Sequence, residues 1–79
     1  MSNSVDQQVI DFTAVYTSRP VEEIHNSTIL ANIGINTPDD LVIYLTELED
    51  SFKLVYEPGD EVGIVTVGNA AELIEKKLG

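Results

Sequence analysis

The stretch Thr37-Pro38-Asp39-Asp40 marks the start of a helix more clearly than any other point in the chain. A threonine hydroxyl at this position can accept a hydrogen bond from a free N–H group of the first turn. Proline fits directly after it, because its missing N–H is not needed there. The two aspartates follow where the helix dipole favours negative charge. The sequence therefore predicts a helix that begins at Thr37.

The residues after this start continue a helical pattern up to Phe52 or Lys53. Apolar residues recur at intervals of three and four, which is the spacing of one helix face. That face consists of Leu41, Leu45, Leu48 and Phe52, supported by Val42. The acidic residues expected to project away from it are Glu47, Glu49 and Asp50.

Two further long helices are predicted, one on each side. The first has a stripe formed by Val5, Val9, Phe12 and Tyr16, with Ile10 alongside. The last begins at Thr66 as a cap and presents Val67, Ala70, Ala71, Ile74 and Leu78 to the core, with Lys76 and Lys77 near its end. Residues 65–67 could also be a strand fragment, but the sequence offers no partner strand, so the helix is preferred.

The connections between these helices differ in character. Residues 17–37 form one long loop rich in Ser, Asn, Thr and Pro, and its apolar residues should anchor it on the core. These anchors are Ile24, Ile29, Leu30, Ile33 and Ile35. Residues 56–60 have the composition of a turn, and residues 60–64 are long enough for one short helical turn with Val62 and Ile64 inward. The predicted fold is a single all-α domain over residues 1–79, with three longer helices and a short third one.

The composition restricts the kind of protein and partner. Fourteen acidic and four basic residues give a net charge of −10, which disfavours nucleic acids and anionic membranes as ligands. At 43% hydrophobic residues the chain can form a core, so the charge belongs to a folded surface that favours a soluble monomer. Met1-Ser2-Asn3-Ser4 has no signal-peptide pattern, no apolar run approaches the ~20 residues of a membrane span, and cysteine is absent. A cytoplasmic location is expected.

Residue patterns for enzyme chemistry are weak. His25 is the only histidine, and without a cysteine or an evident acid–base partner it is interpreted as a loop residue. The pairs Asp39-Asp40 and Asp60-Glu61 lack the alternating ligands and central glycine of a calcium loop. There is also no glycine-rich phosphate loop. We expect neither an enzyme nor a metal site.

Eight acidic residues are concentrated between residues 39 and 61, where Lys53 is the one basic residue. They are Asp39, Asp40, Glu47, Glu49, Asp50, Glu57, Asp60 and Glu61. This concentration is consistent with a solvated face that keeps the protein soluble, and equally with a docking surface for basic partners.

The predicted layout of helix, long anchored loop, acidic helix, short helix and final helix resembles the acyl carrier protein family over nearly the whole chain. The most specific stretches are Pro20-Val21-Glu22-Glu23-Ile24, Ile33-Gly34-Ile35-Asn36-Thr37, Leu48-Glu49-Asp50-Ser51-Phe52 and Ile64-Val65-Thr66-Val67. The resemblance implies an acyl-carrier-like four-helix bundle.

The resemblance also implies a function. In that family a serine in a Leu-Gly-x-Asp-Ser-Leu segment carries 4′-phosphopantetheine, and this chain has Asn36, Thr37 and Pro38 at the Asp-Ser-Leu positions. The family's acidic second and third helices bind basic biosynthetic enzymes and the phosphopantetheinyl transferase. The corresponding residues here are Asp39, Asp40, Glu47, Glu49, Asp50, Asp60 and Glu61. A sheltered acyl chain would be lined by Leu45, Leu48, Ile64 and Ile74, unless these form an ordinary core.

Two functions therefore remain open from the sequence, and a third possibility is an acidic helical protein unrelated to that family. One is a carrier for fatty-acid, lipid or polyketide assembly that is modified at Thr37. The other is an interaction or regulatory scaffold that kept the fold and the acidic face without the prosthetic arm.

Overall fold

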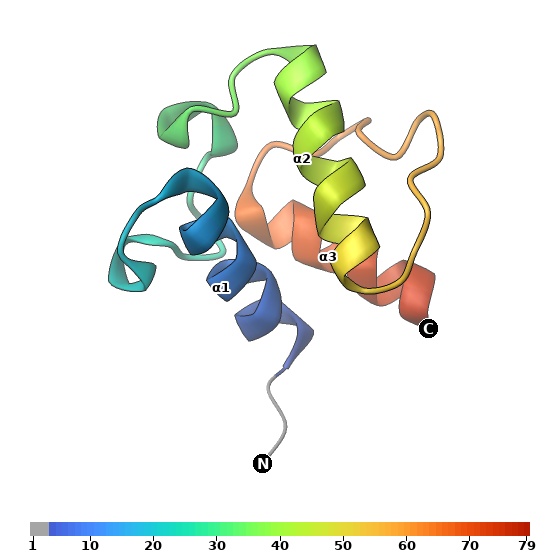
Figure 1. Ribbon diagram of the computed structural model, residues 1–79, viewed down its shortest axis with the longest axis horizontal. Coiled ribbons are helices and arrows are strands. Elements are labelled where there is room, and N and C mark those ends of the chain that lie inside the picture. Colours follow the sequence, from blue (N-terminus) through green and yellow to red (C-terminus); the bar gives the residue numbers. More distant parts are fainter. Residues whose placement is uncertain (1–3) are drawn as a thin grey trace.

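The computed structural model describes residues 4–79, and this part of the chain contains three α-helices and no β-strand (Figure 1). The helices are α1 (Val5–Thr17), α2 (Pro38–Ser51) and α3 (Val67–Leu78). Two 3-10 helices, η1 (Val21–Glu23) and η2 (Leu30–Ile33), lie between α1 and α2. The predicted all-α class is confirmed. Residues 1–3, on which the signal-peptide expectation partly rests, lie outside the described residues.

The start of α2 is the one that the sequence predicts. Thr37 is its N-cap, and the Thr37 hydroxyl accepts a hydrogen bond of 3.0 Å from the backbone N–H of Asp40. Pro38 occupies the first turn, where its fixed φ suits a helix. The helix ends at Ser51, and Lys53 then adopts a positive φ of 61° that turns the chain away.

The other two helices have caps of the same kind. Ser4 accepts a hydrogen bond from the N–H of Gln7 at the start of α1. Thr66 caps α3 as predicted, and Asn69 completes a capping box with it. Each cap satisfies N–H groups that have no partner within the helix.

The connection between α1 and α2 is packed against the core, as predicted, although one of its five proposed anchors is exposed. Ile24, Leu30, Ile33 and Ile35 are buried, whereas Ile29 is not. The prediction that Ile29 anchors the loop on the core is therefore wrong. The backbone is extended at Ile29 and forms an antiparallel bridge with Thr66, and successive side chains of extended backbone point to opposite sides.

The segment between α2 and α3 is where the predicted layout fails. Residues 58–63 form consecutive turns rather than a short helix. Gly59 and Gly63 have φ values of +104° and +79°, which interrupt a right-handed helix. Val62 is exposed, contrary to prediction, while Ile64 packs against the core. The four-helix arrangement is therefore not present in residues 4–79.

The core lies where α1 packs on α3 and the inner face of α2 covers them. Its buried apolar residues are Val9, Ala14, Ile24, Leu30, Ile33, Ile35, Tyr44, Leu45, Leu48, Val67, Ala70, Ala71 and Ile74. Leu78, which was also predicted to face the core, is half exposed at the end of α3.

A buried polar contact links α1 to α2 inside this core. The hydroxyls of Thr13 and Tyr44 are 2.6 Å apart, and the Thr13 hydroxyl also donates to the carbonyl of Val9. The Tyr44 ring packs against the rings of Tyr16 and Phe12, with centroid distances of 5.3 and 6.1 Å. These contacts fix the position of α2 relative to α1.

The connection between α1 and α2 and the first part of the connection between α2 and α3 lie on different sides of α2 (Figure 1). The two connections meet just before α3, where Ile29 forms the bridge with Thr66 and the Leu30 N–H donates to the Val65 carbonyl. In the part of the chain that the structure describes, no helix is both long and apolar enough to cross a membrane. The exposed face of α2 and the segment that follows it form the candidate docking site.

Candidate docking site

Thr37 lies exposed at the N-terminal end of α2. Its hydroxyl oxygen accepts from the N–H of Asp40 and keeps its own proton available. Asp39 is exposed in the first turn and Asp40 is half-buried beside it. The structure thus places the predicted cofactor-binding residue next to two of the predicted docking residues.

One face of α2 carries most of the exposed carboxylates. Asp39, Ile43, Glu47 and Asp50 follow one another in steps of four, four and three residues, which keeps them on one side at 100° per residue. All four side chains are exposed, and Asp40 borders them. None of these carboxylates has an ion-pair partner among residues 4–79. We call Asp39, Asp40, Glu47 and Asp50 the acidic face of α2.

Glu49 does not belong to this face, which corrects the expectation that it projects outward. Its side chain is 0% exposed and forms an ion pair with Lys77 of α3. The Lys77 ammonium also pairs with Asp60 and donates a 2.9 Å hydrogen bond to the carbonyl of Val55. We call these four groups the Lys77 cluster. Because it uses the charges of Glu49 and Asp60 internally, they cannot contribute to docking as free carboxylates.

Within the Lys77 cluster, the pKa values of Glu49 and Lys77 are raised and the pKa of Asp60 is lowered. Burial raises the pKa of Glu49 against the opposing hydrogen bond from Lys77, and the second Glu49 oxygen has no hydrogen-bond partner. Burial also acts to raise the pKa of Asp60, but the hydrogen bonds from Lys77 and from the Glu57 N–H lower it overall. Burial acts to lower the pKa of Lys77, and the bonds to Asp60 and Glu49 outweigh it. The cluster therefore holds a charged Lys77 and a charged Asp60, with Glu49 the hardest group to ionise.

Glu61 is also engaged within the chain. Its carboxylate accepts a hydrogen bond from the Tyr56 hydroxyl and another of 3.0 Å from the Gly59 N–H. The bond from Tyr56 lowers the pKa of Glu61, and the same bond raises the pKa of Tyr56 to about 12. Of the seven predicted docking residues, the four on the acidic face of α2 remain without such internal bonds.

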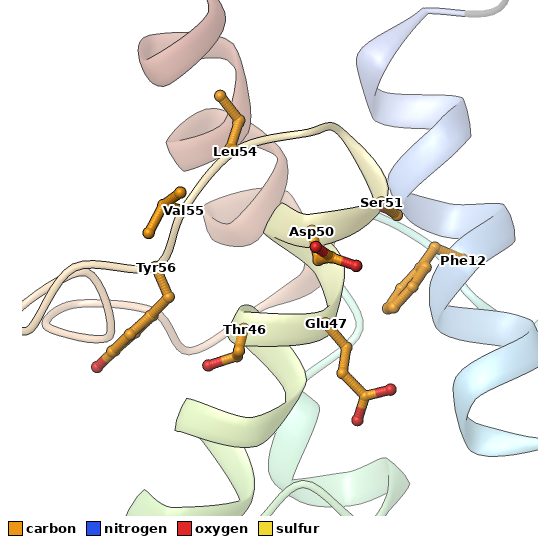
Figure 2. Close-up of a pocket in the computed structure, with 8 residues that line it drawn as sticks. All are labelled: Phe12, Thr46, Glu47, Asp50, Ser51, Leu54, Val55 and Tyr56. Carbon is orange, nitrogen blue, oxygen red and sulfur yellow. The ribbon is translucent and has the colours of Figure 1, made fainter.

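A shallow pocket of about 490 Å³ crosses the C-terminal half of α2. Figure 2 shows Glu47 and Asp50 between Phe12 of α1 on one side and Val55 with Tyr56 on the other. We call this pocket the α2 groove, and its lining residues are Phe12, Thr46, Glu47, Asp50, Ser51, Leu54, Val55 and Tyr56. The acidic face thus continues into a partly apolar hollow.

A second pocket, of about 370 Å³, adjoins Thr37 and is lined mainly by apolar residues. They include Ile29, Leu30, Ile35, Leu41, Ile64 and Val65. Ile64 was predicted to line an acyl-chain shelter, but Leu45, Leu48 and Ile74 are fully buried in the core and line neither pocket. Of the four residues named for the shelter, Ile64 alone therefore lines this pocket.

Several contributing residues were not predicted from the sequence. Val55 and Tyr56 follow the end of α2, and their apolar character so close to a turn was the available signal. The sequence predicts Lys77 near the end of the last helix, and no neighbouring residue indicates its buried partners. His25 is exposed in the loop, and its backbone N–H donates to the Thr28 hydroxyl. Among residues 4–79, no three His, Asp or Glu side chains gather as metal ligands would.

No protein-family model matches this chain, and a search of curated proteins finds no significant relative.

Proposed function

We propose that this chain is an acyl-carrier-like docking domain that binds basic surfaces of biosynthetic enzymes through the acidic face of α2. The observation that carries the proposal is the alignment of exposed carboxylates on one side of a single helix, without ion-pair partners among the described residues. The negative electrostatic potential of these carboxylates attracts a basic partner over several ångströms and orients it before contact. The enzymes would belong to fatty-acid, lipid or polyketide-type synthesis.

The order of the elements supports the acyl-carrier comparison. A long connection anchored on the core comes first, and it is followed by α2, an acidic helix capped by Thr37. We propose that residues 58–63 take the place of the short third helix of that family. Since Gly59 and Gly63 impose turns, this part of the proposed docking domain is a folded loop held by the Lys77 cluster.

Docking can be tested with a broad-specificity phosphopantetheinyl transferase as the basic partner, with affinity measured over a range of salt concentrations. A variant that replaces the acidic face of α2 by amides (D39N, D40N, E47Q and D50N) should bind at least about tenfold more weakly at low salt. The matched control carries E22Q, E23Q, E72Q and E75Q, four exposed acids outside α2. Equal losses in both variants, or binding that ignores salt, would contradict the proposal.

A second candidate function, carriage of 4′-phosphopantetheine on Thr37, has its own support. The Thr37 hydroxyl is exposed at a helix N-terminus, where N–H groups favour a phosphate, and an apolar pocket adjoins it. These features fit the group, whose thiol supplies a thioester link for acyl chains. Against it stands the Thr37 methyl group, which restricts the torsion of the attacking oxygen. The alternative is a scaffold that docks without the arm.

The mass of the protein distinguishes the carrier from the scaffold. The chain and a Thr37→Ser variant are incubated with coenzyme A, magnesium and the same transferase, and their intact masses are recorded. A gain of one phosphopantetheine by the parent protein would establish the carrier. A gain by the variant alone would show that threonine blocks the arm, and the scaffold function would then stand.

A further inference from the structure

The α2 groove offers a specific combination of chemical groups. The hydroxyls of Thr46 and Ser51 donate to the backbone carbonyls of Val42 and Leu48, at 2.7 and 2.6 Å. The Tyr56 hydroxyl donates to Glu61. The three hydroxyl groups that line the groove therefore already donate hydrogen bonds within the chain. What remains for a ligand is apolar surface and the carboxylates of Glu47 and Asp50.

The apolar walls of the groove are held in place by contacts behind them. The Phe12 ring stacks on Tyr16 at a centroid distance of 5.8 Å and also packs against Tyr44. On the opposite wall, the carbonyl of Val55 accepts a hydrogen bond from Lys77, while Val55 as a residue is 79% exposed. A ligand would therefore meet preformed apolar surfaces, which lowers the entropic cost of binding.

Charge decides which ligand suits these surfaces. No Lys, Arg or His lines the groove, and the chain as a whole carries a charge of −10. Anionic ligands such as fatty acids or phosphates would be repelled by Glu47 and Asp50. A ligand that combines apolar and cationic side chains would complement both the walls and the carboxylates.

We propose that the α2 groove receives a basic amphipathic helix of a partner protein, with apolar side chains against Phe12 and against Val55 and with Lys or Arg side chains on Glu47 and Asp50, which lie between those two walls. This proposal rests on the proposed docking function and gives its partner a structural class. A helix laid in a groove presents side chains at i, i+3, i+4 and i+7, so apolar and basic residues can alternate across it.

The probe for this proposal is a fluorescent Leu–Lys peptide of about 15 residues with its leucines at i, i+3, i+4 and i+7. Its control is a scrambled peptide of identical composition. We expect the amphipathic peptide to bind at least about fivefold more tightly, because only it forms a continuous apolar stripe. Equal binding of the two peptides would overturn the proposal, since charge alone would then explain the interaction.

A matched pair of variants tests the apolar wall. Val55→Asn removes apolar surface from the groove, whereas Val62→Asn changes an equally exposed valine, 77% exposed, that does not line it. Val55→Asn should weaken peptide binding about five- to tenfold and Val62→Asn should leave it unchanged. Both positions are exposed, so circular dichroism should show an intact fold in each variant.

A second pair tests the charges and separates this proposal from the docking function. E47Q with D50N should weaken binding about three- to tenfold at low salt, and E72Q with E75Q should have a smaller effect. If E47Q with D50N weakens peptide binding more than E72Q with E75Q does, but the two valine variants bind alike, the groove proposal is overturned and docking by charge stands. If neither pair discriminates, both proposals fail.

Discussion

The ammonium group of Lys77, in the last turn of α3, forms an ion pair with the carboxylate of Glu49, a fully buried residue of α2 that lies 28 positions earlier in the chain. The same ammonium pairs with Asp60 and bonds the carbonyl of Val55. One cation therefore connects α2, α3 and the segment between them. Since Val55 lines the α2 groove, the shape of the proposed docking site depends on this contact.

Removing the cation should destabilise the fold. Lys77→Met keeps most of the aliphatic stem but leaves Glu49 buried without its partner, so we expect a loss of about 3 kcal/mol in the free energy of unfolding. The loss should shrink as the pH falls from about 7 to about 5, because protonation removes the buried charge. Denaturant unfolding at the two pH values measures both effects.

The matched control for this variant is Lys76→Met, which changes the neighbouring exposed lysine. It should alter stability by less than about 0.5 kcal/mol. The double variant E49L with K77M should be more stable than K77M alone, because it removes the fully buried carboxylate and leaves only Asp60, whose side chain is 13% exposed, without its cation. A double variant as unstable as Lys77→Met would contradict the view that the isolated carboxylate causes the loss.

Alkaline pH should destabilise the protein, because two tyrosines have raised pKa values in the folded state. Burial raises the pKa of Tyr44 to about 12, against the opposing bond with Thr13, and the bond to Glu61 raises the pKa of Tyr56 to about 12. Both values lie above the 10.0 of an unfolded tyrosine, so the folded state retains protons that the unfolded state releases. Stability from these groups is complete below pH 10 and is lost between about pH 10 and 12.

The contribution of Tyr56 to this loss of stability can be measured with the variant Tyr56→Phe. Unfolding free energies from about pH 9 to about pH 12 should fall less steeply for Tyr56→Phe than for the parent protein, because one of the shifted groups is absent. Absorbance titration of the folded protein should likewise show tyrosine ionisation displaced above pH 10. An unchanged slope in Tyr56→Phe would show that its bond to Glu61 does not persist in solution.

The features that the sequence predicted correctly depend on neighbouring residues. The start of α2 follows from Thr37 and Pro38, and the start of α3 follows from Thr66, because a cap is determined within one helical turn. The apolar face of α2 follows from the helical spacing of Leu45 and Leu48, which the structure buries. The exposed positions of Glu47 and Asp50 follow from the same spacing.

The features that the sequence did not reveal depend on distant residues. Glu49 is a surface residue by residue type, but it follows the buried Leu45 by four positions on the same side of α2, and Lys77 from another helix supplies its counter-charge. Tyr44 lies beside the predicted apolar stripe, and it is buried because Thr13 of α1 offers a hydroxyl partner. The turns at residues 58–63 could have been anticipated from Gly59 and Gly63, but whether a glycine takes a positive φ depends on the surrounding fold.

The hydroxyl of Thr37 should have a measurable structural role apart from any modification. Thr37→Ala removes the bond to the Asp40 N–H and should cost about 1 kcal/mol, or roughly 4–8 °C in Tm. Thr37→Ser keeps the hydroxyl and should stay within about 0.5 kcal/mol of the parent protein. Thermal unfolding followed by circular dichroism measures both, and equal stabilities of the two variants would show that the cap is dispensable.

Gly68 of α3 lies in close contact with the backbone of Asn26 in the loop between α1 and α2. The Gly68 N–H donates to the Asn26 carbonyl at 2.8 Å, and a Cβ on Gly68 would lie only 3.0 Å from that oxygen. Gly68→Ala should therefore lose about 1 kcal/mol of stability, although alanine normally favours a helix. Glu72→Ala, at an exposed position of α3, is the control and should not destabilise. A Gly68→Ala variant as stable as the parent protein would mean that residues around Asn26 move aside freely.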